Sequence, residues 1–185
     1  MILQSTFIND LYVIKPKVYT DERGFFYEFY NQTEFDKLTR HKIRFIQDNL
    51  ARSRKGVLRG LHFQKSPYAQ TKLVSVLKGA VLDVVVDLRE NSKTFGQYFS
   101  IFLNAENKKQ LFIPRGMAHG YLSLEDDTLF YYKIDNVYHP QSEAGIRFDD
   151  PDLNIDWQYD LSQIILSEKD RTLPYLKDTK EFYEK

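Results

Sequence analysis

Residues 72–90 read KLVSVLKGAVLDVVVDLRE, and this stretch decides the predicted fold class. Between positions 82 and 88, leucine and valine alternate with Asp83, Val85 and Asp87. Alternation with a period of two is typical of a β-strand that turns one face toward a core. Lys78-Gly79 separates this run from the one before it, so the pattern predicts a β-hairpin with its turn at these two residues.

Similar runs rich in Val, Ile, Phe and Tyr recur between turn residues on both sides of this stretch. They lie at residues 24–30, 57–63, 96–103, 110–124 and 128–134. Such a series predicts an all-β protein, and periodicity alone leaves a sandwich and a barrel open. The sequence TEFDKLTRH at 33–41 predicts one short helix, capped by Asn31 or Thr33, and residues 166–185 allow one or two further helical turns around Pro174.

Composition limits the class of protein. The chain has 185 residues, 42% of them hydrophobic, which suits one domain over residues 1–185. The formal net charge is zero and the basic residues are scattered, so we expect no nucleic-acid or membrane partner. There is no cysteine for a disulfide or thiolate metal site, and we see no signal peptide or membrane-spanning run. We therefore expect the protein in the cytoplasm.

Two of the four histidines lie inside apolar runs. His62 belongs to VLRGLHFQ at 57–64 together with Arg59, and His119 belongs to PRGMAHGYLSL at 114–124. A buried imidazole or guanidinium is costly without a partner, and burial can bring a histidine pKa to a value useful in catalysis. A hydrogen-bonded core histidine remains an alternative for both. His41 and His139 lie in polar surroundings, and we interpret them as exposed residues.

The chemistry available to these residues is limited. GVLRGLHFQ at 56–64 and PRGMAH at 114–119 resemble the two signature segments of the cupin superfamily, which implies a jelly roll. Gln64 stands where metal-binding cupins carry a second histidine, and two imidazoles make a poor metal site, so we expect no metal. The sequence has no Gly-x-Ser-x-Gly elbow and no phosphate-binding glycine loop. Proton transfer remains, which needs a histidine oriented by a carboxylate, an acid and a cation.

Longer motifs carry a more specific resemblance. They are RGLHFQ (59–64), residues 69–98, LNAENKKQLFIPRGMAHGYLSL (103–124), residues 130–157 and LSEKDRTLP (166–174). In this order they resemble the dTDP-4-dehydrorhamnose 3,5-epimerase family over nearly the whole chain. The resemblance implies a metal-free, cofactor-free, cupin-type jelly-roll barrel that acts as a homodimer. It also implies a dTDP-4-dehydro-6-deoxy-glucose substrate, inverted at C3 and C5.

The resemblance also assigns residues. It implies that His62 is the base, Asp170 its orienting carboxylate and Tyr132 the acid. Lys72, helped by Arg59, is implied to stabilise negative charge on the C4 oxygen. The other implied binding residues are Arg23 and Glu28 from the partner, Gln47, Asp48 and Asn49, His119, Glu143 and Lys169, with Tyr138 stacked on thymine.

One geometric conflict and three alternative functions follow. Strict alternation places Arg59 and His62 on opposite faces of a strand, so we expect a bulge or sharp twist at Gly60 that turns both toward the cavity. An epimerase that inverts one centre of a related 4-keto deoxysugar nucleotide is the first alternative. A nucleotide-binding cupin without catalysis and a metal-dependent cupin enzyme are the others.

Overall fold

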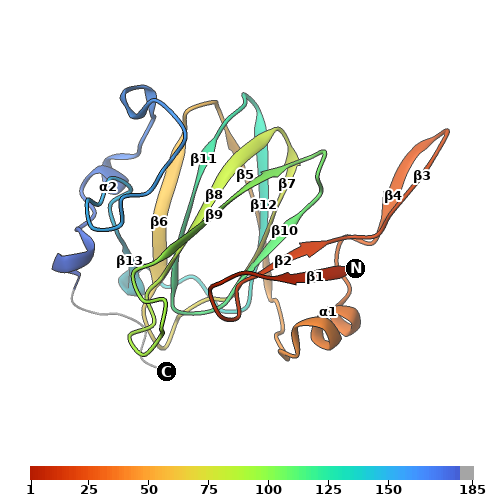
Figure 1. Ribbon diagram of the computed structural model, residues 1–185, viewed down its shortest axis with the longest axis horizontal. Coiled ribbons are helices and arrows are strands. Elements are labelled where there is room, and N and C mark those ends of the chain that lie inside the picture. Colours follow the sequence, from red (N-terminus) through yellow and green to blue (C-terminus); the bar gives the residue numbers. More distant parts are fainter. Residues whose placement is uncertain (180–185) are drawn as a thin grey trace.

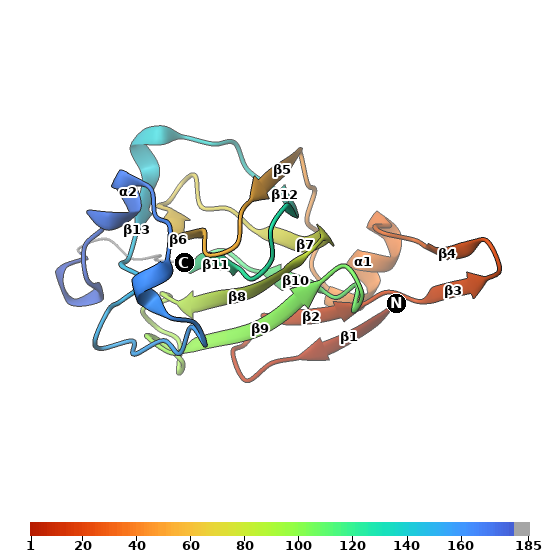
Figure 2. The ribbon, with the colours of Figure 1, turned by 90° about the horizontal axis from the view of Figure 1, so that it is seen from above.

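Two antiparallel sheets packed face to face form the body of the protein in the computed structural model, which describes residues 1–179 (Figures 1 and 2). Across the first sheet lie β1 (Ile2–Ser5), β2 (Tyr12–Lys15), β10 (Gln110–Ile113), β7 (Lys72–Lys78), β12 (Thr128–Ile134) and β5 (Gln47–Ser53). Across the second lie β13 (Glu143–Gly145), β6 (Leu58–Gln64), β11 (Met117–Ser123), β8 (Ala80–Asp87) and β9 (Tyr98–Asn104). The all-β, jelly-roll prediction is confirmed.

A separate hairpin of β3 (Val18–Asp21) and β4 (Gly24–Tyr27) extends away from both sheets (Figure 1). Its strands are largely exposed and carry the aromatic side chains of Tyr19, Phe25 and Phe26 on the surface. Apolar rings on a projecting hairpin bury little area within their own chain, so this hairpin contributes little to the core.

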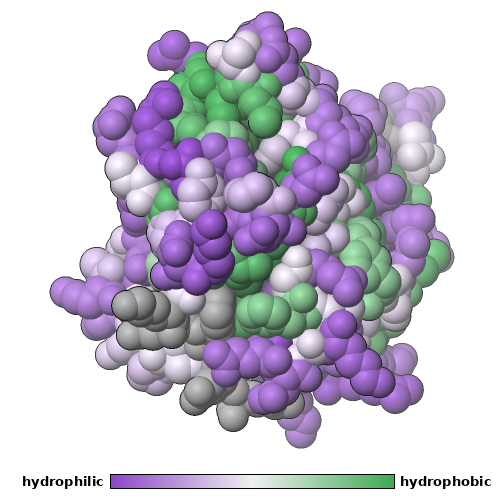
Figure 3. All heavy atoms as spheres, turned by 60° about the vertical axis from the view of Figure 1, so that its left-hand side comes forward, coloured by the Kyte–Doolittle hydropathy of each residue, from purple (hydrophilic) through white to green (hydrophobic). Residues whose placement is uncertain are grey.

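The second sheet is buried on both faces, because a core lies on each side of it. Val81 and Val85 of β8 face the first sheet, whereas Leu82, Val84 and Val86 face a second apolar cluster formed with residues 146–176. Figure 3 views the side of the molecule on which the C-terminal segment lies, and hydrophilic side chains cover most of it. The alternation indicated one face turned toward a core, and the C-terminal segment covers the other face as well.

The hairpin predicted at Lys78-Gly79 is also wrong. Strand β7 pairs with β10 and β12 in the first sheet, whereas β8 pairs with β9 and β11 in the second. Gly79 has φ +77°, and a Cβ atom there would lie 2.4 Å from Thr128 Oγ1. A corner that passes close to Thr128 therefore carries the chain from one sheet to the other, which a jelly roll requires and a local pattern does not reveal.

Helices are short and peripheral. The predicted N-terminal helix is α1 (Gln32–Thr39), and the Asn31 side chain caps it by accepting a hydrogen bond from the Glu34 N–H at 3.2 Å. Near the C-terminus lie α2 (Glu168–Arg171) and 3₁₀-helical turns at Leu161–Gln163 and Leu176–Asp178, and a further 3₁₀ turn spans Pro140–Ser142. The predicted tail helices are thus present up to 179, and residues 180–185 lie outside the described residues. Over residues 1–179 no helix has the length and apolar character to cross a membrane.

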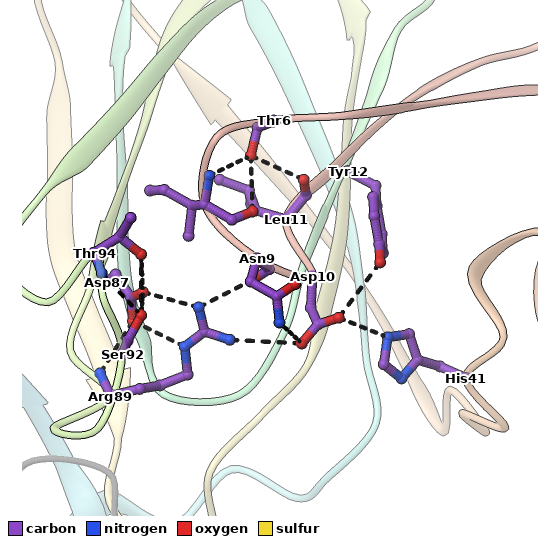
Figure 4. Close-up of polar contacts among 11 residues, drawn as sticks. Thr6, Asn9, Asp10, Leu11, Tyr12, His41, Asp87, Arg89, Ser92 and Thr94 are labelled. Atoms are coloured by element: carbon purple, nitrogen blue, oxygen red, sulfur yellow. Dashed lines mark hydrogen bonds and ion pairs between the residues drawn. The ribbon is translucent and has the colours of Figure 1, made fainter.

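A polar network fastens the turn between β1 and β2 to the loop after β8 (Figure 4). Asp87 accepts hydrogen bonds from Arg89, Ser92 and Thr94 at 2.6–2.8 Å, and Arg89 donates to the carbonyl of Asn9 at 3.0 Å. These bonds hold the N-terminal strands against the barrel.

Two histidines interpreted as exposed are half-buried. His41 lies 3.6 Å from Asp10 and packs against Phe112. His139 stacks on Tyr68 with a centroid distance of 3.9 Å. Ring packing, which the polar surroundings in sequence do not reveal, covers both.

Candidate active site

Strand β6 changes face at Gly60, and this brings Arg59 and His62 to the same side of the sheet. The register with β11 shifts between the residues that pair with Arg59 and His62, and Gly60 has φ +128°. Leu58 and Leu61, three residues apart, both pack in the second apolar cluster, on the side of the sheet covered by residues 146–176. Arg59 and His62 both line a cavity between the two sheets. The predicted irregularity at Gly60 is confirmed.

The cavity has a volume of about 510 Å³, within the range of small-molecule sites. Both sheets and the C-terminal segment contribute to its wall. The residues of the predicted site that line it are Arg59, His62, Lys72, His119, Tyr132, Lys169 and Asp170. The fold therefore collects residues spread over more than a hundred positions into one cavity.

His62 is held by Asp170 from α2. The distance from His62 Nε2 to Asp170 Oδ1 is 2.7 Å, and the Asp170 side chain is 5% exposed. Burial raises the pKa of Asp170, but hydrogen bonds from His62 and the Gly60 N–H, with the His62 charge, outweigh burial and leave the pKa below its ordinary value. An ionised carboxylate only accepts, so Nε2 of the neutral ring carries the proton and Nδ1 is free to act as a base.

Two cations lie along the same cavity. Lys72 begins β7, and burial lowers its pKa to about 8, an effect that the negative charges of Asp83 and Glu143 oppose. The Arg59 guanidinium donates to Ser53 Oγ at 3.3 Å and to the Arg52 carbonyl at 3.4 Å. An ammonium and a guanidinium in a partly dry cavity are suited to stabilise a developing oxyanion.

Tyr132 reaches the cavity from the opposite sheet. It belongs to β12, and its neighbour Phe130, two residues earlier, stacks on Tyr121 with a centroid distance of 4.0 Å. Burial raises the pKa of the Tyr132 phenol, and the charge of Arg59 opposes this in part. The phenol is therefore protonated at neutral pH and available as a proton donor.

Glu143, Lys169 and Tyr138 form a connected group beside the cavity. Lys169 makes an ion pair with Glu143, and the Tyr138 hydroxyl donates to Glu143 Oε2 at 2.6 Å. Burial raises the pKa of Glu143, but these two partners and His62 outweigh it, so the pKa is lowered. The Tyr138 side chain is 54% exposed, so one face of its ring is available to a ligand.

Strand β5 places its predicted site residues on two different faces. Asn49 pairs with Tyr132 across the ladder, and Gln47 donates to Asn49 Oδ1 at 2.9 Å, so both lie on the cavity side. Asp48 points to the other face, where Lys133 binds it at 2.6 Å. The structure therefore does not bring Asp48 to the cavity, because neighbouring strand residues point to opposite faces.

Arg23 and Glu28 also lie away from the cavity of their own chain. Arg23 is exposed at the tip of the β3–β4 hairpin and binds Asp21, and Glu28 follows β4 and accepts a hydrogen bond from Asn31 at 3.0 Å. If these two side chains serve a site, it is that of another molecule.

Sequence reasoning did not single out Asp83, which binds the cavity residue His119. Its carboxylate is fully buried and lies 3.0 and 3.2 Å from His119 Nε2. An aspartate inside an apolar alternating run was the available signal, and we used it only as part of the alternation that indicates a strand.

Gln64 has a structural role at the position where a second histidine would stand. Its side chain donates to the carbonyls of Tyr68 and Val137 at 2.7 and 3.0 Å and accepts from the His139 N–H. Within residues 1–179 no group of three or more His, Cys, Asp or Glu side chains is arranged to hold a metal ion.

The fold and cavity define a class of protein. This is a jelly roll whose His–Asp pair, buried phenol and buried ammonium are the groups needed to move a proton at a carbon next to a carbonyl. The sequence profile of the family described as dTDP-4-dehydrorhamnose 3,5-epimerase matches residues 5–178. The chain belongs to the dTDP-4-dehydrorhamnose 3,5-epimerase family and is an isomerase.

Individual relatives are similar over almost their full length. The dTDP-4-dehydrorhamnose 3,5-epimerase of Escherichia coli is 50% identical over 91% of this chain and 90% of its own. The crystal structure of the enzyme of that name from Elizabethkingia anophelis is 52% identical, with a TM-score of 0.93 over 96% of this chain and 97% of that one. The dTDP-6-deoxy-D-glucose-3,5-epimerase of Legionella pneumophila, in complex with dTDP-4-keto-L-rhamnose, is 47% identical, with a TM-score of 0.93 over 97% and 94%.

Proposed function

We propose that this protein inverts C3 and C5 of dTDP-4-dehydro-6-deoxy-D-glucose to give dTDP-4-dehydro-L-rhamnose, in dTDP-L-rhamnose biosynthesis. The observation that carries the proposal is the His62–Asp170 pair at 2.7 Å in one cavity with Tyr132 and Lys72. A molecule that only binds a nucleotide sugar has no need for a base and an acid on opposite walls of its cavity. We also propose that it works in the cytoplasm, where nucleotide sugars are made.

The chemistry follows from the C4 ketone of the substrate. The ketone acidifies the protons on C3 and C5, and His62 Nδ1 accepts one of them. The electrons left behind form an enolate whose negative charge lies on the C4 oxygen, where Lys72 and Arg59 stabilise it. The Tyr132 hydroxyl returns a proton to the same carbon. His62 belongs to the second sheet and Tyr132 to the first, so a sugar between the sheets loses and gains its protons on opposite faces.

The remaining predicted residues would bind the rest of the substrate. Lys169 lines the cavity and makes an ion pair with Glu143, so its ammonium could bind a negatively charged group of the ligand. Tyr138 would stack on thymine, and Gln47 and Asn49 offer amides from β5. Asp48 does not take part in this proposal, because Lys133 holds it on the other face.

We propose a homodimer in which each hairpin serves the other subunit's site. Arg23 and Glu28 lie on or next to the β3–β4 hairpin, which extends away from both sheets (Figure 2). The exposed aromatic rings of this hairpin would be buried by a second copy.

Deuterium exchange tests the reaction. The protein is incubated with the 4-keto sugar nucleotide in deuterium oxide, and the product is examined by NMR. Label at both C3 and C5 supports the proposal, whereas label at one carbon supports the single-centre epimerase. His62→Ala should abolish exchange and leave the Kd for dTDP within about threefold, since the base does not hold the nucleotide. If His62→Ala exchanges label at the wild-type rate, the mechanism is refuted. If the wild-type protein binds dTDP but exchanges no label, it is a nucleotide-binding protein without catalysis. Loss of exchange on metal removal would indicate the metal-dependent alternative.

Mixed dimers test the shared site. Arg23→Ala and His62→Ala, each inactive alone, are unfolded together and refolded. If Arg23 serves the partner, a mixed dimer has one intact site, and activity returns to about a quarter of the wild-type value. If Arg23 serves its own chain, no mixed dimer has an intact site and activity stays absent. Light scattering measures the dimer directly.

A further inference from the structure

Asp83 is a buried carboxylate that does not line the cavity. It lies on β8 between Val81 and Val85, both members of the cluster between the sheets, and its exposed fraction is 0%. Burying a carboxylate costs several kcal/mol unless charged or hydrogen-bonding partners compensate for its lost hydration. A residue in this place therefore requires partners, and they determine what it does.

The partners of Asp83 come from the elements that form the cavity. Nε2 of His119 on β11 lies 3.0 Å from Asp83 Oδ2; burial raises the pKa of Asp83, and this hydrogen bond and the charges of His119 and of Lys72 on β7 oppose the rise. The remaining titratable group near it is the Tyr121 hydroxyl, from the residue paired with Asp83 across the ladder. His119, Lys72 and Tyr121 all line the cavity, and the charges of Lys72 and His62 act on His119.

Lys72 depends on Asp83 for its countercharge. The acids that act on Lys72 are Asp83 and Glu143 from β13, and Asp83 has the larger effect. Glu143 already binds Lys169 and the Tyr138 hydroxyl, which leaves Asp83 as the carboxylate whose partners are His119 and Lys72.

We propose that Asp83 is a positioning residue of the epimerase site, which fixes the His119 ring through Nε2 and supplies the buried negative charge that keeps Lys72 protonated. The inference rests on the proposed function. Because the Asp83 carboxylate accepts a hydrogen bond from Nε2–H, the neutral His119 ring keeps Nδ1 as an acceptor, suited to a sugar hydroxyl. The Lys72 ammonium must carry its positive charge when the enolate forms. Without Asp83, burial would lower the Lys72 pKa further and favour the neutral amine.

Asp87 provides a matched control. It lies four residues further on the same strand and is also fully buried, but its partners are Arg89, Ser92 and Thr94 in the loop after β8 (Figure 4). Replacing either aspartate with asparagine removes one buried charge of β8. The two variants differ in whether that charge acts on the cavity.

The test is the pH dependence of kcat/KM for wild type, Asp83→Asn and Asp87→Asn. Asparagine can still accept from His119, so Asp83→Asn removes charge while keeping a hydrogen bond. We expect the alkaline limb of its pH profile to move down by about one pH unit from the Lys72 pKa of about 8, so that kcat/KM at pH 8 falls about fivefold, with the Kd for dTDP within about threefold. Asp87→Asn should lose stability but keep the wild-type limb. If Asp83→Asn folds and its kcat/KM has the same alkaline limb as the wild type, the inference is overturned.

A second measurement needs no variant of Asp83. Nitrogen-15 NMR of the four histidine rings of the wild type reports the tautomer of each ring, and single substitutions of His41, His62 and His139 assign His119 by elimination. We expect His119 to carry its proton on Nε2, and a proton on Nδ1 alone would overturn the inference even if Asp83→Asn does not fold. A wild type that exchanges no substrate label would instead refute the proposed function.

Discussion

Gly60→Ala should destabilise the protein by about 2–6 kcal/mol, through two effects of which one can be isolated. The first is backbone strain, because φ +128° is a conformation that residues with a Cβ rarely adopt, and holding one there costs about 1–3 kcal/mol. The second is a clash, because a Cβ at Gly60 would lie 2.5 Å from Gly120 Cα and 2.9 Å from the His119 carbonyl oxygen. Both are backbone atoms, so β6 and β11 must separate, at a cost of about 1–3 kcal/mol.

Gly24→Ala is the matched control for the strain. Gly24 has φ +125°, nearly the value at Gly60, and a Cβ there would meet no atom within 4 Å. This variant should therefore show the strain without the clash, a loss of about 1–3 kcal/mol. The difference between the two losses in free energy of unfolding is the cost of the clash between β6 and β11.

Urea unfolding followed by tryptophan fluorescence gives both values. Trp157, the one tryptophan of the chain, is buried in the second apolar cluster and donates to the Phe148 carbonyl at 2.8 Å. The titrations are run at equal protein concentration, because association shifts apparent stability. Equal losses in the two variants would refute the close approach at Gly60. Wild-type kcat/KM in Gly60→Ala would refute the idea that this break in β6 positions Arg59 and His62.

Three further predictions concern charges. Asp170→Asn removes the countercharge of a protonated His62, so kcat should fall about 100-fold with the Kd for dTDP unchanged in calorimetry; an unchanged kcat would contradict this role. The pKa of Lys72, about 8, predicts that kcat/KM decreases above pH 8 as the ammonium is lost, and a level profile from pH 7 to pH 9.5 would argue against a charged Lys72. Burial raises the pKa of Asp87, but hydrogen bonds from Arg89 and its neighbours outweigh it and leave the folded-state pKa below the unfolded value. Asp87 therefore stabilises the fold above about pH 4 and loses this effect as pH falls through its folded pKa. Asp87→Asn should cost about 2 kcal/mol at pH 7 in urea titrations, less at low pH, and a pH-independent difference would oppose the assignment.

Long apolar runs predicted their strands, including the exposed β4, whereas short strands such as β2 and polar strands such as β5 were not predicted. All the apolar runs identified in the sequence form strands, for example Thr128–Ile134 and Tyr98–Asn104. Strand β5, QDNLARS, was missed because most of its residues are polar and exposed at the edge of the first sheet. Its strand conformation comes from pairing with β12, which supplies backbone hydrogen bonds that a local pattern does not encode.

Connections between strands were harder to predict than strands. Lys78-Gly79 has the composition of a tight turn, and Gly79 does adopt a positive φ. Whether such a turn joins partners in one sheet or moves the chain to another depends on where the following strand finds neighbours. Strand β8 finds β9 and β11, both later in the sequence, so this information is not local.

The site shows the same division between local and distant information. The sequence showed that strict alternation would place Arg59 and His62 on opposite faces. It also showed Gly60 between them, where a break in the strand could turn both to one side. The His62–Asp170 pair joins residues 108 positions apart, and spacing gives no access to it. Only the resemblance to the family indicated it. Asp83 was visible as an aspartate in an apolar run, but its interpretation needed a fact that the pattern lacks, namely that both faces of β8 are buried.

The arrangement of acid and base on opposite sheets bears on the stereochemistry of the proposed reaction. A sugar held between the sheets presents one ring face to His62 and the other to Tyr132, so removal and return of a proton at one carbon inverts that carbon. C3 and C5 both flank the C4 ketone, and in both steps the negative charge develops on the same oxygen. If that oxygen stays beside Lys72 and Arg59, the ring needs only to shift around it to expose its second carbon to the same two groups. Between the two steps His62 releases its extra proton to water and Tyr132 regains one from water. One base, one acid and one fixed oxyanion site then suffice for two inversions, and the cation pair is the part of the site that both steps share.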